Sequence, residues 1–69
     1  MKIKLDYVRR INGSADCWVD YTALTPLGRR IGCVRVGPMQ DPFALANKDA
    51  ESEYTYLRLV RAVGEEREV

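Results

Sequence analysis

Apolar and charged residues alternate at the start of the chain with the period of a β-strand. Within residues 2–11 the apolar positions are mostly odd-numbered and the charged ones mostly even-numbered: Ile3, Leu5, Tyr7 and Ile11 against Lys2, Lys4, Asp6 and Arg10. A half-buried strand shows this alternation because successive side chains point to opposite faces. We therefore predict a first strand over residues 2–11, ended by the turn-forming residues that follow it.

The next segment predicts a β-hairpin. Residues 17–25 and 29–36 are rich in Trp, Val, Tyr, Thr and Ile, the residue types that fit a pleated surface. Between them, Pro26 suits the first central position of a type I turn, and Gly28 can take the left-handed conformation that follows it. Together with the first strand, the hairpin predicts a three-stranded antiparallel meander.

The lengths of the loops predict which residues share a face. If Thr25 and Arg29 close the second loop, Tyr21 lies opposite Cys33. A five-residue first loop places Tyr7 opposite Tyr21 in the same way. Both registers gather odd-numbered apolar residues, including Ile31 and Cys33, on one core face, and a slip of one residue in either would destroy that agreement.

The second half of the chain predicts a helix followed by an ambiguous segment. Asp41 and Pro42 form a helix-start signal, so we predict a short helix over residues 42–50. Residues 53–63 contain tyrosine and valine, which favour a fourth strand. The alternative is one long helix over residues 42–62, whose apolar stripe would contain Phe43, Ala46, Ala50, Tyr54, Leu57 and Val60.

The predicted architecture is α+β, with three meander strands, a short helix and a fourth strand completing the sheet. A small SH3-like barrel is a further alternative. At 69 residues the chain is expected to form one small domain over residues 1–63, with a charged tail over residues 64–69. No apolar run approaches the roughly 20 residues that span a bilayer, and no signal peptide is recognisable, so we expect a cytoplasmic protein without membrane contact.

The residue types that most catalytic and metal sites need are scarce. The chain contains no histidine, so Ser-His and Cys-His chemistry is not expected, and two cysteines alone do not predict a zinc site. In the expected register Cys17 and Cys33 are about 13 Å apart along the strands, which predicts free, buried thiols. We therefore expect no enzyme, no cofactor, no metal and no small-molecule substrate.

Charge is distributed unevenly along the chain. Residues 1–37 contain seven cations and three carboxylates, whereas residues 38–69 contain four cations and seven carboxylates. The predicted even-numbered face would join Trp18 as a stacking platform to four candidate phosphate-binding cations: Lys2, Lys4, Arg10 and Arg30. This is the basis of the alternative that the protein binds nucleic acid, although a net charge of +1 is low for that function.

Large aromatic residues provide the candidates for a protein interface. Tryptophan, tyrosine and arginine dominate interface hot spots. If Trp18 faces outward, it would form a binding face together with Val34 and Val36, and Tyr54 and Tyr56 are further candidates.

The expected function is that of a non-enzymatic interaction module, an inhibitor or adaptor that occupies the surface of a protein partner. Phages and plasmids often carry chains of this kind, including inhibitors of host defence, so such an origin is one expectation. A homodimer or a structural homo-oligomer is the remaining alternative, because a small core and open sheet edges both gain from self-association.

Overall fold

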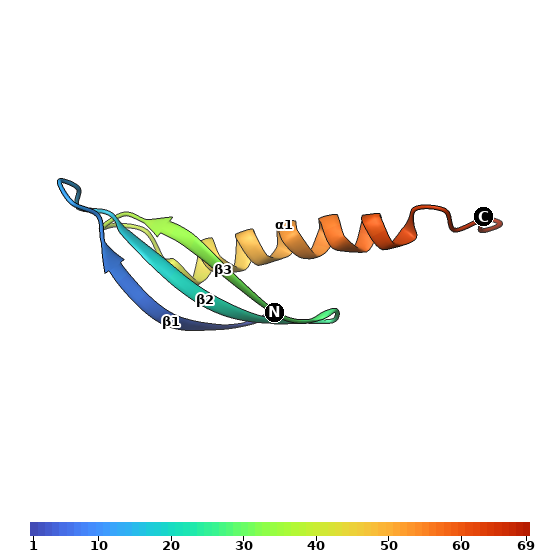
Figure 1. The fold of residues 1–69 in the computed structure, drawn as a ribbon, viewed down its shortest axis with the longest axis horizontal. Helices are drawn as coiled ribbons and strands as arrows, with labels where there is room; N and C mark the ends of the chain where they lie inside the picture. The colour runs from blue at the N-terminus through green and yellow to red at the C-terminus, as the bar shows by residue number, and fades with distance from the viewer.

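The computed structural model describes residues 1–69 and contains three strands and one helix. Strands β1 (Lys2–Arg10), β2 (Cys17–Thr25) and β3 (Gly28–Val36) form an antiparallel sheet in that order, and helix α1 (Pro42–Ala62) follows. Figure 1 shows α1 along one face of the sheet and extending past the β2–β3 turn. The predicted α+β meander is confirmed as an open sheet with one helix, and that helix does not combine the length and the apolar character needed to cross a membrane.

The C-terminal segment is a single helix, so the fourth strand expected over residues 53–63 does not form and the alternative of a helix over residues 42–62 is the correct one. The carboxylate of Asp41 caps the helix by accepting a hydrogen bond of 3.0 Å from the Phe43 backbone N–H. Tyrosine and valine favoured a strand in this segment. A helix, however, satisfies its backbone hydrogen bonds internally and needs no free sheet edge.

The β2–β3 turn closes one residue earlier than predicted. Thr25 pairs with Gly28 and not with Arg29. Gly28 has a φ of 102°, the left-handed conformation expected after a type I turn. The Thr25 hydroxyl donates to the Gly28 carbonyl at 2.7 Å and accepts from the Leu27 N–H at 3.1 Å, which fixes this tight geometry.

This one-residue shift places each side chain of β3 on the opposite face of the sheet from the one predicted. Tyr21 lies opposite Gly32 instead of Cys33. As a result Val34 lies on the face covered by α1, while Cys33 and Ile31 lie on the uncovered face. The prediction that Ile31 and Cys33 belong to the core was therefore wrong, because side chains alternate strictly along a strand.

A bulge in β1 changes the register a second time. Leu5 pairs with Tyr21, but two residues later Tyr7 pairs with Asp20. The predicted pairing of Tyr7 with Tyr21 is therefore wrong. Beyond the bulge the odd-numbered residues of β1 lie on the uncovered face, because an extra residue in one strand inverts the alternation that follows it.

The core lies between the middle of the sheet and the first half of α1. Tyr21 and Ala23 of β2 pack against Ala46 and Ala50 of the helix. The two alanines permit a close approach of the helix to the sheet. Only seven residues in the chain are buried, so the core is small.

Candidate interaction surfaces

The side of the sheet away from α1, which we call the open face, presents four cross-strand rows of side chains. Opposing residues of neighbouring strands lie side by side on one face. From one end of the sheet to the other, the rows are Arg9-Trp18-Arg35, Tyr7-Asp20-Cys33, Lys4-Thr22-Ile31 and Lys2-Leu24-Arg29.

The first row places a tryptophan between two arginines. Trp18 is 39% exposed, so much of its ring faces solvent. The Arg9 guanidinium donates a hydrogen bond of 3.0 Å to Asp20 and another of 3.4 Å to the Cys33 sulfur. Arg9 therefore crosses the sheet from β1 toward β3 and is held there by residues of the next row.

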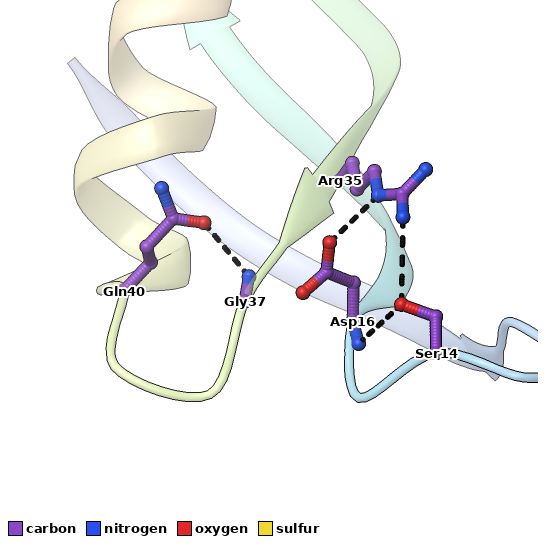
Figure 2. A network of polar contacts seen from close by, with 5 residues as sticks. All are labelled: Ser14, Asp16, Arg35, Gly37 and Gln40. Carbon is purple, nitrogen blue, oxygen red and sulfur yellow. Dashed lines mark hydrogen bonds and ion pairs between the residues drawn. The ribbon is translucent and has the colours of Figure 1, made fainter.

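The second arginine of the row is held by the loop between β1 and β2. Figure 2 shows the Arg35 Nε donating to the Asp16 carboxylate at 2.8 Å and its Nη2 donating to the Ser14 hydroxyl at 3.4 Å. The Asp16 backbone N–H also donates to the Ser14 hydroxyl, at 3.1 Å. The loop thus orients Arg35 beside Trp18.

A neighbouring contact fixes the connection from the sheet to the helix. The Gly37 backbone N–H donates a hydrogen bond of 2.7 Å to the side-chain carbonyl of Gln40 (Figure 2). This contact stabilises the short segment between β3 and α1. Hydrogen bonds in two loops therefore stabilise the end of the sheet that contains Trp18.

Exposed apolar side chains extend the open face away from Trp18. Ile31 is 85% exposed, and Leu24 and Tyr7 are also exposed. Sequence reasoning missed Ile31 because the predicted register placed it in the core. It also missed Arg9 and Arg35 as neighbours of Trp18, although the pairing that joins them follows directly from the observed turn and bulge.

The thiols differ from the prediction that both are buried. Cys17 is half-buried and Cys33 is exposed, and both are free. Desolvation of the Cys33 thiol, together with the adjacent Asp20 carboxylate, raises its pKa above the ordinary value even though the residue as a whole is exposed. The thiol form is therefore favoured over the thiolate, which is the nucleophile.

The five residues predicted for a protein interface do not form one surface. Trp18 lies on the open face, but Val36 is buried and Val34 packs against the core on the covered face. The expectation that these valines flank Trp18 was wrong because of the one-residue shift in β3. Tyr54 and Tyr56 lie on α1, where Tyr54 is half-buried and Tyr56 is exposed.

The four predicted phosphate-binding cations are also divided between the two faces. Lys2 and Lys4 lie on the open face with Trp18, as expected. Arg10 lies opposite Cys17, and Arg30 lies opposite Ala23, so both belong to the other face.

The open face therefore gathers a different set of cations from the predicted one. These are Lys2, Lys4, Arg9, Arg29 and Arg35. Ion pairs join three of them to carboxylates: Lys4 to Asp6, Arg9 to Asp20 and Arg35 to Asp16.

A second exposed apolar surface lies on the far half of α1 and on Val63, the residue that follows the helix. Tyr56, Leu59, Val60 and Val63 recur at helical spacing, and their exposed fractions range from 49% to 82%. We call these four residues the distal row. Beyond Leu57 every residue of the chain is exposed.

Comparison with protein-family models, curated proteins and solved structures finds no match.

Proposed function

We propose that the protein is a non-enzymatic interaction module, an inhibitor or adaptor, that binds a protein partner through its open face. The observation that carries this proposal is the Arg9-Trp18-Arg35 row at one end of that face. Tryptophan and arginine are the residue types most enriched among interface hot spots.

The fixed positions of both arginines support this proposal. Arg9 is held by Asp20, and Arg35 is held by Asp16 and Ser14, before any partner arrives. Association normally costs roughly 0.5–1.5 kcal/mol for each flexible side chain that it orders. Arginines that are already held lose less conformational entropy and can contact carboxylates or aromatic rings of a partner in a defined geometry.

Exposed apolar residues farther along the open face also support a protein partner. Ile31 and Leu24 give the face exposed hydrocarbon between charged positions, the usual mixture at a protein–protein interface. Nucleic acid requires free cations for its phosphates. Of the five cations on the open face, Lys4, Arg9 and Arg35 are already paired with carboxylates and only Lys2 and Arg29 are free of ion pairs, which favours a protein over a nucleic-acid ligand.

The test is capture from a lysate of the source organism, followed by affinity measurement with the recovered partner. We expect a stoichiometric protein partner that survives nuclease treatment. Replacing Ile31 by Lys and, separately, Trp18 by Ala should each weaken the complex by about tenfold or more. Ile31→Lys is the cleaner variant, because an 85% exposed side chain contributes little to the fold.

The matched control is a change of the same kind on the helix, outside the exposed apolar residues at its C-terminal end. Ala44→Lys also adds a lysine at an exposed apolar position and should leave partner affinity unchanged. Equal loss of binding in Ala44→Lys and Ile31→Lys would contradict an interface on the open face. Recovery of nucleic acid alone, or loss of the captured partner on nuclease treatment, would contradict a protein partner.

A further inference from the structure

We infer that two copies of this chain associate through the distal row of α1. Tyr56, Leu59, Val60 and Val63 follow the i, i+3, i+4, i+7 pattern of a helix that buries one stripe against another element. About half or more of each side chain stays exposed in one copy, and Figure 1 shows the C-terminal end of α1 extending past the β2–β3 turn.

The total surface of the molecule is larger than that of a compact monomer of the same mass. The accessible surface is 5596 Å², whereas a compact monomer of this size is expected to expose about 4,400 Å². The excess of about 1,200 Å² exceeds the roughly 800 Å² per partner that a standard stable interface buries. Part of this excess belongs to the exposed tail over residues 64–69, and the remainder is available to a contact centred on the distal row.

The radius of gyration and the longest extent of the chain also exceed those of a compact domain. Its radius of gyration is 15.1 Å, while a compact domain of the same length has one of about 11 Å. The longest extent is 53 Å, against 19 Å and 17 Å in the other directions. The additional length includes the far half of α1 and the tail, where no residue beyond Leu57 is buried (Figure 1).

A second copy fits the distal row better than an unrelated partner. A row that packs against its own equivalent around a two-fold axis buries every apolar member on both helices at once. The cations Arg58 and Arg61 follow other directions around the helix, so two apolar rows can meet without placing these like charges between them. The small core, with seven buried residues, also gains stability from the association.

The experiment is sedimentation equilibrium of the full chain over a range of concentrations, with urea unfolding at low and high concentration. We expect a monomer–dimer equilibrium and an unfolding midpoint that rises with protein concentration. Leu59→Glu should raise the dimer dissociation constant on the order of 100-fold, because it places a charge in an apolar contact. Arg58→Glu introduces the same side chain at the adjacent position off the row and should leave the dissociation constant within about threefold of the original.

The variants also separate folding from association. Leu59 is 59% exposed in a single copy, so Leu59→Glu should keep the fold at low protein concentration, as Arg58→Glu does. A wild-type chain that stays monomeric at all concentrations tested would overturn the inference. So would a dimer that persists unchanged in Leu59→Glu, since its contact would then lie elsewhere. Trp18→Ala should leave the dimer intact, which distinguishes this surface from the proposed partner site.

Discussion

At the scale of single residues, Gly32 is required by the tyrosine that faces it. A Cβ atom at Gly32 would lie 2.5 Å from the Cζ atom of the Tyr21 ring, closer than van der Waals contact permits. Tyr21 in turn is one of the four residues that form the core cluster. Glycine normally weakens a strand, but here its missing side chain accommodates the largest member of the core.

We therefore expect Gly32→Ala to destabilise the protein by about 1–3 kcal/mol, the usual cost of overpacking a core. Urea unfolding measures this change directly. Cys33→Ala is the control, because Cys33 is the next residue along β3 and lies exposed on the open face. Equal stability of Gly32→Ala and the wild-type chain would show that the Tyr21 ring does not lie over this glycine.

Tyr21 also predicts how stability depends on alkaline pH. Its hydroxyl donates a 2.5 Å hydrogen bond to Asp49 on α1. Burial, followed by the hydrogen bond and the charge of Asp49, raises the pKa of Tyr21 far above its usual value of 10.0. The unfolded chain consequently loses this proton at a lower pH than the folded chain.

Stability contributed by Tyr21 should be complete below about pH 10 and fall as the pH rises further, by at most about 1.4 kcal/mol per pH unit. Urea unfolding between pH 8 and about pH 11.5 tests this, with Tyr21→Phe as the comparison. The Phe variant should show a smaller fall above pH 10, since it has no phenol to ionise. Identical pH profiles would contradict the burial of the Tyr21 hydroxyl against Asp49.

At the scale of the elements, the N-terminal cap should contribute measurably to the stability of the helix. Only Ala46 and Ala50 of α1 are fully buried, so tertiary packing supports mainly the first half of its 21 residues. We expect Asp41→Ala to cost about 0.5–2 kcal/mol and Asp41→Asn to cost much less, because asparagine also caps well. Circular dichroism during thermal unfolding compares the two. Equal losses would mean that the Asp41 side chain does not cap α1.

The strands and helix start could be predicted because they depend on local signals. Alternation over residues 2–11, the Pro26 and Gly28 turn, and the Asp41 cap each act within a few residues. The register could not be predicted to the residue. Closure of the turn at Gly28 and a bulge after Leu5 each change the alternation, and a one-residue change moves a whole segment to the other face.

The same limitation explains what was missed at the candidate site. Trp18 was identified as an interface candidate because tryptophan is enriched at interface hot spots, and that argument does not depend on the register. Its neighbours Arg9 and Arg35 depend on both registers, and Ile31 was assigned to the core by the wrong one. The far half of α1 was ambiguous for a different reason. Its exposed tyrosine and valines have strand propensity, and too few of its side chains are buried within one copy to favour a helix over a strand.

At the scale of the whole molecule, the two proposed surfaces lie on different elements. The open face lies on the side of the sheet away from α1, and the distal row lies at the C-terminal end of α1, which extends past the β2–β3 turn (Figure 1). A dimer formed through the distal row would leave both open faces free. Such a dimer could engage two partner molecules or two sites of one partner, and in the second case avidity would add to affinity.

The most direct test of the central claim uses Trp18, the only tryptophan in the chain. Incorporated 5-fluorotryptophan gives one ¹⁹F resonance that reports on the open face during titration with the captured partner. The account predicts that partner binding shifts this resonance and protects the ring from a soluble quencher, while dilution of the free protein leaves it unchanged. A resonance that stays unshifted and equally accessible at saturating partner would contradict binding through the Arg9-Trp18-Arg35 row.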